Sequence, residues 1–335
     1  YDSEIVPNRA RTPGTEHFWG LNNPGLSARL ESWNPQAVLL FGYKYASHLR
    51  TIAWARRRGV PIIFRGDSHL LGRPRPGWLQ RCFLRWVFRQ FRAVTCVGAA
   101  NRDYFRTFSV PERKLFFVPH CVDHSLYDPS RQEYARSATA LRTELGIAPD
   151  TRVVLFAGKF VADKQPRELL EAFVSLRPRN AALLFAGDGP EKDGLVASAA
   201  AQLDAQVRFL PFANQSEMPA RYAAADVFAL PSRGHYETWG LAVNEAMHMG
   251  LPCIVSDRVG CQQDLVTEGE TGWVFHATDA ADLRDKLGTA LTADLAPYRP
   301  RIATRIAGYT YEIASAGLAG LLGTLCDPQL KMPQP

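Results

Sequence analysis

The sequence predicts an α/β protein built from two doubly wound, Rossmann-like domains that face each other across a cleft. Its 335 residues exceed what one ordinary core uses and suit two domains of about 150 residues each. Short β-branched runs alternate with helical stretches in both halves, which is typical of parallel sheets covered by helices. A polar stretch containing Pro129 and Pro149 separates the halves. We therefore expect a first domain over residues 1–125, a linker over 126–150 and a second domain over 151–308.

Four apolar runs in the first half have the length and composition of buried strands. They cover residues 37–41, 60–64, 93–97 and 114–118. The stretch Ser47–Arg58 between the first two runs is predicted to be a helix that stops at Gly59, a residue that ends helices without strain. The alternation of strand, helix and strand predicts a parallel sheet.

Five further runs predict the strands of the second domain. They cover residues 152–157, 181–186, 207–210, 226–230 and 253–256, with the spacing of a doubly wound sheet. The last part of the chain, residues 309–335, contains the helical run Tyr309–Leu322. We expect this helix to pack back on the first domain.

Composition and charge narrow the class of protein. Hydrophobic residues make up 46% of the chain, a globular composition, and no run reaches the roughly 18 uncharged apolar residues of a membrane span. The six cysteines show no metal-ligand or redox spacing, which favours free thiols and a cytoplasmic setting. The net charge of +6 is uneven: residues 1–125 hold 19 Lys or Arg and 8 Asp or Glu. A basic first half suggests an anionic acceptor or surface, although solvated arginines are the alternative.

The loop after the strand at 152–157 carries the features of a phosphate site. Gly158 permits a tight turn, and Lys159 and Lys164 lie beside a helix N-terminus, whose unpaired N–H groups favour an anion. Two solvated lysines would be the alternative interpretation. The next loop contains Gly187 and Asp188, where glycine lets the backbone approach a flat ligand.

The most informative loop follows the strand at 226–230 and reads Glu237-Thr238-Trp239-Gly240, with a predicted helix over Leu241–Met249. Glu237 falls just before this helix and Glu245 about one turn inside it, so their carboxylates are staggered by roughly 7–10 Å. This offset suits one carboxylate on a transferred sugar and the other on ribose hydroxyls. Glu245 as a solvated helix residue is the alternative, but its neighbours are apolar.

The N–H groups at the start of this helix would face a diphosphate held between the two carboxylates. They belong to Trp239, Gly240 and Leu241. We assign Phe212, which follows the strand at 207–210, to the same nucleotide site. The donor site predicted from these loops therefore comprises Gly158, Lys159, Lys164, Gly187, Asp188, Phe212, Thr238, Trp239, Gly240, Leu241 and Glu245.

Taken together, these segments resemble the family-four retaining glycosyltransferases of the GT-B fold (glycosyltransferase group 1 type). Glu237 and Glu245 stand in the family's paired-glutamate motif, and Lys159 and Lys164 take the positions of its diphosphate-binding pair. The turn Pro119-His120-Cys121-Val122-Asp123 is similar to the family's interdomain turn, with His120 and Cys121 departing from it. The resemblance covers nearly the whole chain and is densest over residues 152–275.

The resemblance implies a function: transfer of a hexose from a nucleotide diphosphate sugar with retention of anomeric configuration and without a metal or other cofactor. The sequence contains no Asp-x-Asp pair. UDP is favoured over GDP as the carrier, and the acceptor would be a glycan, a lipid-linked sugar or a small molecule. Glu237 would bind sugar hydroxyls as a catalytic residue. Alternatives are a nucleotide-sugar epimerase or hydrolase of the same fold, or a non-catalytic nucleotide-sugar binder.

Two departures from the family pattern lie in the first domain. Where a histidine is expected after the strand at 60–64, the sequence has Arg65-Gly66-Asp67-Ser68, so we assign Asp67 and Arg65 to the catalytic, acceptor-facing side. The family's opening strand and glycine-rich loop find no counterpart near Tyr1–Asn8. The resemblance therefore implies a first domain that is truncated at its N-terminus.

The stretch Trp78–Arg92 is aromatic and cationic and contains no acidic residue. On a helix, its arginines Arg81, Arg85, Arg89 and Arg92 share a stripe. The pattern is consistent with a helix that lies on an anionic membrane surface near a lipid-linked acceptor. The protein would then be a peripheral protein of the inner face of the membrane. The alternative is a core helix with a basic outer face. No recognition motif for nucleic acid accompanies the charge.

Overall fold

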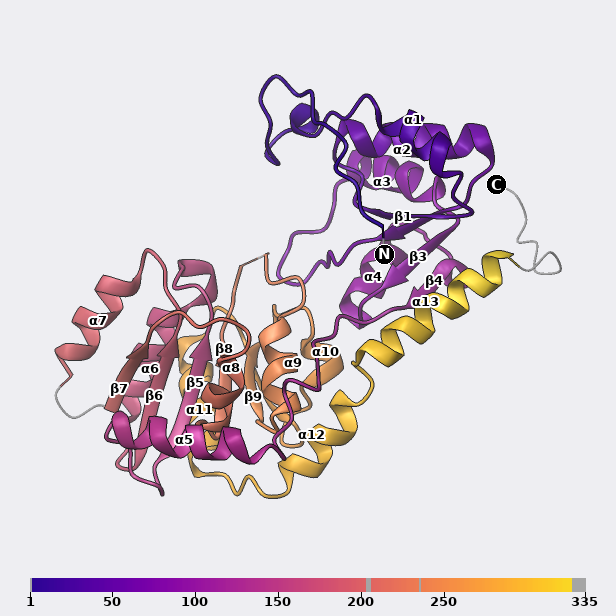
Figure 1. Ribbon diagram of the computed structural model, residues 1–335. Coiled ribbons are helices and arrows are strands. Elements are labelled where there is room, and N and C mark those ends of the chain that lie inside the picture. The colour runs from indigo at the N-terminus through magenta and orange to yellow at the C-terminus, as the bar shows by residue number, and fades with distance from the viewer. Residues whose placement is uncertain (1, 203–205, 235, 327–335) are drawn as a thin grey trace.

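The protein folds into two α/β domains, each with a fully parallel sheet (Figure 1). The computed structural model describes residues 2–202, 206–234 and 236–326. The sheet of the first domain has the strand order β1-β2-β3-β4, and that of the second has the order β10-β9-β8-β5-β6-β7. The second order places β5 and β8 side by side at the centre, where the winding reverses, as predicted for a doubly wound sheet.

The first domain alternates strands and helices as the apolar runs predicted. Its strands are β1 (Val38–Phe41), β2 (Ile62–Arg65), β3 (Ala93–Cys96) and β4 (Leu115–Phe117). Its helices are α1 (Leu26–Trp33), α2 (Ala46–Arg58), α3 (Trp78–Arg89) and α4 (Ala99–Thr107), with 3-10 turns η1 (Phe18–Gly20) and η2 (Glu112–Lys114).

Alternating side chains of β2 divide the core of the first domain into two parts. Phe64 points to the side of α2 and α3 and packs in a cluster of aromatic rings with Phe88, Phe91 and Phe105. Ile63 points to the opposite face, where it meets Leu321. Because successive side chains of a strand face opposite ways, a covering element is required on both faces of this sheet.

Helix α13 (Tyr311–Cys326) supplies the cover on the second face, so the last helix returns to the first domain (Figure 1). It lies against β4 at very short range: a Cβ at Gly317 would come within 2.2 Å of the Phe117 carbonyl oxygen. Glycine at this position therefore sets how closely the helix approaches the strand.

The second domain contains the five predicted strands and one more. The strands are β5 (Arg152–Ala157), β6 (Ala181–Ala186), β7 (Gln206–Leu210), β8 (Val227–Leu230), β9 (Cys253–Ser256) and β10 (Gly272–Phe275). The helices are α6 (Pro166–Leu176), α7 (Lys192–Ala200), α8 (Met218–Ala223), α9 (Leu241–His248), α10 (Gln262–Leu265), α11 (Ala280–Thr292) and α12 (Tyr298–Ile306), with the turn η3 (Ala162–Lys164). The sequence did not predict β10.

Residues 126–150, expected to be a linker, include helix α5 (Gln132–Glu144), which packs on α8 of the second domain. Its buried side chains Tyr134 and Ala138 join the large core of that domain. Arg142 fixes the helix to the sheet: its Nη2 donates to Asp226 Oδ2 at 2.9 Å, and its Nε donates to the Ala224 carbonyl at 2.9 Å. The same Asp226 oxygen accepts from the Val153 backbone N–H at 2.8 Å.

The two domains are joined by a carboxylate at a helix N-terminus. Asp264 of the second domain accepts hydrogen bonds from the Ala99 N–H, the first residue of α4, at 3.0 and 2.9 Å. The Tyr309 hydroxyl, just before α13, donates to the same carboxylate at 3.1 Å. A negative charge at a helix N-terminus is stabilising, so this contact favours the observed docking of the domains.

None of the helices in the described part of the chain is both long enough and apolar enough to span a membrane.

We expect Asp226→Ala to lower the free energy of unfolding by about 2 kcal/mol, because it leaves the buried Val153 N–H and Nη2 of Arg142 without their acceptor. Urea unfolding followed by circular dichroism measures this. Asp285→Ala removes an exposed carboxylate that pairs with the neighbouring Arg284, and should cost less than about 0.5 kcal/mol. Equal losses in the two variants would contradict the role given to Asp226.

Candidate active site

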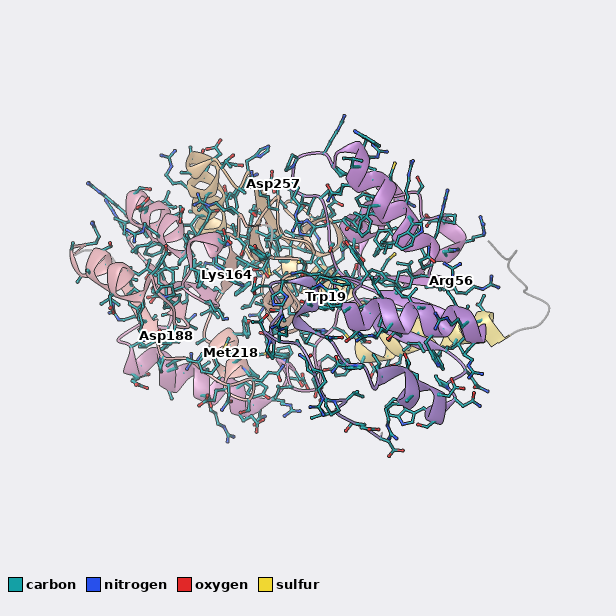
Figure 2. The ribbon with its side chains drawn as sticks, turned by 90° about the horizontal axis from the view of Figure 1, so that it is seen from above. Trp19, Arg56, Lys164, Asp188, Met218 and Asp257 are labelled. Atoms are coloured by element: carbon teal, nitrogen blue, oxygen red, sulfur yellow. The ribbon has the colours of Figure 1, made fainter. Side chains whose placement is uncertain are left out.

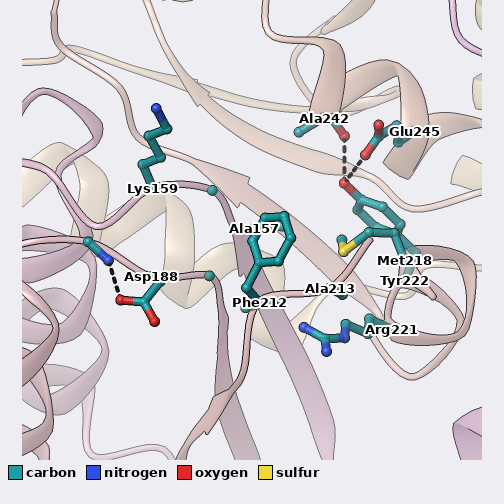
Figure 3. Close-up of a pocket in the computed structure, with 14 residues that line it drawn as sticks. Ala157, Lys159, Asp188, Phe212, Ala213, Met218, Arg221, Tyr222, Ala242 and Glu245 are labelled. Atoms are coloured by element: carbon teal, nitrogen blue, oxygen red, sulfur yellow. Dashed lines mark hydrogen bonds between the residues drawn. The ribbon is translucent and has the colours of Figure 1, made fainter. Parts of the chain in front are cut away.

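A pocket of about 600 Å³ lies at the carboxyl ends of the central strands of the second domain (Figure 3). In a doubly wound sheet this edge is where ligands bind. The walls come from the loops after β5, β6 and β7, from α8 and from the first turns of α9. The lining residues are Ala157, Gly158, Lys159, Ala186, Gly187, Asp188, Gly189, Phe212, Ala213, Met218, Arg221, Tyr222, Ala242 and Glu245.

Two glycine loops in direct contact form one side of this pocket. The Gly158 N–H donates to the Ala186 carbonyl at 3.0 Å, and a Cβ at Gly187 would lie 2.0 Å from the Gly158 carbonyl oxygen. Gly187 also has a φ of +152°, which side-chain-bearing residues rarely adopt. The pocket therefore has bare backbone on this side, where a ligand can approach closely.

Charged side chains stand at the rim of the glycine loops. Lys159 is exposed, and Figure 3 shows its amine directed away from Asp188. Asp188 accepts from the Lys192 ammonium at 2.7 Å and from the Gly189 N–H at 2.7 Å, and these contacts lower the pKa of its carboxyl. Asp188 is thus already paired, whereas Lys159 offers a cation to the pocket.

Glu245 forms the opposite wall together with a buried tyrosine. The Tyr222 hydroxyl donates to Glu245 Oε2 at 2.7 Å, the contact drawn in Figure 3. Burial raises the pKa of the Glu245 carboxyl, and interactions with the hydroxyls of Tyr222 and Tyr127 act in the opposite direction. Phe212 projects from the loop after β7 and is 75% exposed, so its ring is free to contact a bound molecule.

Glu237 and Lys164 form an ion pair beside the pocket, at the N-terminal end of α9. The Lys164 Nζ donates to Glu237 Oε2 at 2.8 Å, and the Ser232 hydroxyl donates to the same oxygen at 2.9 Å. The Glu237 side chain is only 15% exposed. The sequence placed Lys164 with Lys159, but in this structure Lys164 contacts the carboxylate of Glu237 and does not line the pocket.

The loop that leads into α9 is fixed by tight packing. The Trp239 indole is buried and donates a hydrogen bond to Asn244 Oδ1 at 2.7 Å. Its ring packs so closely on Gly98 that a Cβ at Gly98 would lie 2.4 Å from it. Gly240 has a φ of +102° and directs the backbone into the helix, whose first residue, Leu241, is half exposed. The N–H groups of the first turn of α9 therefore have a defined position.

Asp67 of the first domain reaches across to this loop. The Thr238 hydroxyl donates to Asp67 Oδ2 at 2.8 Å, and His120 Nε2 lies 3.4 Å from the same oxygen. These contacts, the one with His120 foremost, hold the pKa of Asp67 at about 2 despite partial burial. Asp67 is therefore an ionised carboxylate at the junction of the domains.

His69 makes a second contact across the same junction. Its Nδ1 accepts from the Leu71 N–H at 3.1 Å, so the proton of a neutral ring resides on Nε2, which then donates to the Glu237 carbonyl at 3.2 Å. The ring is 1% exposed. His69 thus contacts the backbone of Glu237, and Asp67 contacts the side chain of the adjacent residue, Thr238.

Arg65 is directed toward the backbone of its own domain. Its Nη1 donates to the Val118 carbonyl at 3.1 Å and to the Thr95 hydroxyl at 3.4 Å. Burial lowers the pKa of its guanidinium. It does not line the pocket at the carboxyl edge of the second sheet.

The structure brings most of the predicted site residues together in two adjoining groups. Those that line the pocket are Gly158, Lys159, Gly187, Asp188, Phe212 and Glu245. Those beside it, in the loop before α9 and its contacts, are Lys164, Glu237, Thr238, Trp239, Gly240, Leu241 and Asp67. Sequence reasoning missed the pocket residues Met218, Arg221 and Tyr222, which lie on the short helix α8 with no motif to mark them. It also missed His69, His120 and Asn244.

Among the residues that the structure describes, no three His, Cys, Asp or Glu side chains are grouped so as to hold a metal ion.

Solved structures with the same architecture identify the fold as GT-B. The chain matches HepE from Anabaena, crystallised with UDP and glucose, with a TM-score of 0.70 and 18% identity over 90% of this chain and 82% of that one. It matches sucrose-phosphate synthase from Thermosynechococcus elongatus with a TM-score of 0.68 and 20% identity, over 89% and 75% of the two chains.

Sequence comparison then gives the family. Residues 137–307 match the family described as glycosyl transferases group 1, and residues 5–121 match the glycosyl transferase 4-like domain. The chain belongs to the group 1 glycosyl transferases.

Curated relatives in this family have several named activities. The chain is 34% identical to the D-inositol 3-phosphate glycosyltransferase of Corynebacterium efficiens over 57% of this chain and 46% of that protein. It is 31% identical to a GDP-mannose-dependent alpha-(1-6)-phosphatidylinositol monomannoside mannosyltransferase of Mycolicibacterium smegmatis, over 76% and 66% of the two chains. The chain spans about half the length of several such relatives.

We expect Asp67→Asn to lower the free energy of unfolding at neutral pH by about 1 kcal/mol, after allowance for solvent screening of a carboxylate that is 41% exposed. A carboxyl whose pKa falls from 3.8 to about 2 on folding stabilises the native state above pH 4. The difference between the two proteins should therefore shrink as the pH falls from about 4 to 2. Urea unfolding at a series of pH values measures it.

The matched control for Asp67→Asn is Asp103→Asn, an exposed carboxylate on α4. It should show no comparable difference in this pH window. A pH-independent loss in Asp67→Asn would mean that the ionised carboxylate is not what stabilises the junction.

Proposed function

We propose that the protein is a retaining glycosyltransferase that moves a hexose from a nucleotide diphosphate sugar, with UDP favoured over GDP. The acceptor is a glycan, a lipid-linked sugar or a small molecule. The observation that carries the proposal is the combination, at one sheet edge, of a pocket between Lys159 and Glu245 with the ordered N-terminus of α9 beside it. The enzyme acts in the cytoplasm, with the stretch Trp78–Arg92 against the inner face of a membrane.

The pocket suits a nucleotide diphosphate in one orientation. The Glu245 carboxylate, which the Tyr222 hydroxyl holds in place, accepts from ribose hydroxyls. The diphosphate lies between Lys159 and the N–H groups at the start of α9, where a helix N-terminus favours negative charge. The base lies toward Phe212, whose exposed ring offers a stacking surface. Bare backbone at Gly158 and Gly187 leaves room for the phosphates.

The transferred hexose would then lie near Glu237. Its carboxylate is oriented by Lys164 and Ser232, and its backbone carbonyl by His69, so its position is set before substrate binds. Asp67 faces the same region from the first domain as an ionised carboxylate and serves on the acceptor side. Arg65 supports this side from within the first domain, through its bonds to the backbone that leads to His120.

The leaving diphosphate needs compensation of its negative charge, and in this proposal the protein supplies it without a metal ion. Lys159 at the pocket, and Lys164 and the N–H groups of α9 beside it, provide cationic and dipolar groups for this purpose. Fixed donors of this kind stabilise charge that develops in a transition state, because they need no reorganisation as the bond breaks.

We expect the protein to bind UDP-sugars more tightly than GDP-sugars and to transfer the hexose with retention of configuration, with chelators leaving the rate unchanged. Calorimetry with a panel of UDP- and GDP-hexoses, GDP-mannose included, measures the first property. The anomeric configuration of the product, determined by NMR, measures the second. Absence of nucleotide binding by folded protein would refute the donor site, and binding followed only by epimerisation or hydrolysis would refute transfer.

Two variants should distinguish the contact with the diphosphate from the contact with the ribose. We expect Lys159→Ala to weaken binding of UDP by about 10-fold or more while leaving the affinity for uridine unchanged, because a charge-assisted contact contributes about 1.5–3 kcal/mol. Glu245→Ala should weaken both ligands, since both carry the ribose. Calorimetry with UDP and uridine measures this.

The control for Lys159→Ala is Lys286→Ala, which removes a lysine paired with Glu268 on the surface of the second domain. Its affinity for UDP should equal that of the unaltered protein. Equal affinity of Lys159→Ala for UDP would place the diphosphate elsewhere.

A further inference from the structure

The outer face formed by α2 and α3 combines strong positive charge with exposed apolar side chains. Residues 32–102 contain 13 Lys or Arg and a single acidic residue, Asp67, which lies at the domain junction. Neither α2 nor α3 contains an acidic residue. We call this surface the α2–α3 face. It lies on the side of the first sheet opposite α13 (Figure 1).

The helix α3 is apolar on two sides, of which the core uses only one. Leu84, Val87 and Phe88 are buried against the first sheet. Trp78, Leu79, Phe83 and Trp86 are exposed to between 54% and 73%. The rings of Phe83 and Trp86 stack on each other at 6.3 Å between centroids rather than on the core. A row of large apolar side chains in water marks an interaction surface.

Three arginines of this face lack an acidic partner in the described part of the chain. Arg57, Arg81 and Arg89 are exposed and form no ion pair with any residue that the structure describes. Arg58 at the end of α2 differs, because it pairs with Glu31 of α1. Three guanidinium groups without ion pairs favour an anionic partner, and the exposed rings beside them favour a partner that also has an apolar part.

A groove of about 360 Å³ runs between the two helices. Its walls are mostly apolar, and two arginines and the amide of a glutamine complete them. The groove is separate from the pocket of the second domain: Figure 2 shows Arg56 remote from the pocket residues Asp188 and Met218. The lining residues are Leu49, Ile52, Ala53, Arg56, Arg57, Trp86, Val87 and Gln90. A hydrocarbon chain fits such walls, and the arginines at the rim fit a phosphate attached to it.

We propose that the α2–α3 face docks on a bilayer that contains anionic phospholipids. Arg57, Arg81 and Arg89 contact phosphate oxygens, the side chains of Trp78, Leu79, Phe83 and Trp86 enter the boundary between headgroups and acyl chains, and the groove takes the hydrocarbon of one lipid. The proposal rests on the membrane association in the proposed function. It adds which surface docks, that the lipids are anionic and that the groove binds a hydrocarbon chain.

A second copy of the chain fits this face less well than a bilayer does. A symmetric dimer would bring the same surface of both copies together, so arginines without counter-charges would face arginines. Like charges in contact oppose association, whereas anionic lipid headgroups neutralise them.

The test is co-sedimentation of the full chain with vesicles of phosphatidylcholine alone and of phosphatidylcholine mixed with phosphatidylglycerol. We expect binding only to the mixed vesicles, weakened by salt. Arg81→Ser/Arg89→Ser should bind these vesicles about 25-fold more weakly, because each arginine near an anionic surface contributes about fivefold. Leu79→Ser/Phe83→Ser should bind weakly at all salt concentrations. The control Arg136→Ser/Arg299→Ser removes two exposed arginines of the second domain and should bind like the unaltered protein.

Three results would overturn the proposal: no binding of the unaltered chain to mixed vesicles, an equal loss in the control, or conversion of a dimer to a monomer by Leu79→Ser/Phe83→Ser in sedimentation velocity. Calorimetry with UDP and thermal melting identify any variant that has not folded. Vesicle binding needs no nucleotide sugar, so its outcome is separate from that of the transfer reaction. A protein that binds vesicles but no nucleotide would refute only the donor site.

Discussion

The loop from Glu237 to Gly240 has almost no freedom of position, and the candidate site is built around it. A Cβ at Gly260 would lie 1.8 Å from the Thr238 carbonyl oxygen, and one at Gly98 would lie 2.4 Å from the Trp239 ring, so glycines of both domains enclose the loop. The Gly260 and Cys261 N–H groups donate to the Glu237 and Trp239 carbonyls at 3.2 and 2.9 Å. The start of α9, the Glu237 carboxylate and the bond to Asp67 all follow from where this loop lies.

The strands buried on both faces were the part of the fold most open to prediction. The bounds of β5 and β6 agree with the apolar runs at 152–157 and 181–186, because a parallel strand covered on both sides is apolar at nearly all of its positions. The strand β10 was not predicted because it begins with a glycine and closely follows a turn at Gly269. The packing of α5 on α8 was not predicted, since amphipathicity alone does not indicate which helix is the partner.

Within the site, contacts local in sequence or carried by a motif could be predicted, and contacts between distant loops could not. Lys159, Gly187 and Glu245 follow strand ends that must meet at one edge of the sheet, and they do line one pocket. The bond between Asp67 and Thr238 spans 171 positions and depends on how the domains dock, which no spacing encodes. The ion pair between Lys164 and Glu237, which are 73 positions apart, could not be predicted either. The sequence suggested that the Lys164 ammonium faces a ligand, whereas in the structure it contacts the Glu237 carboxylate.

The return of α13 to the first domain has a consequence for biosynthesis. The face of the first sheet that holds Ile63 and Ala93 is covered by Leu321, more than two hundred positions later in the chain. During translation this face is bare while the whole second domain is being made and folded. The aromatic cluster on the other face, around Phe64 and Phe88, forms from residues made early and has to keep the nascent domain compact in the meantime. Of these two domains, the one translated earlier is thus the one completed later.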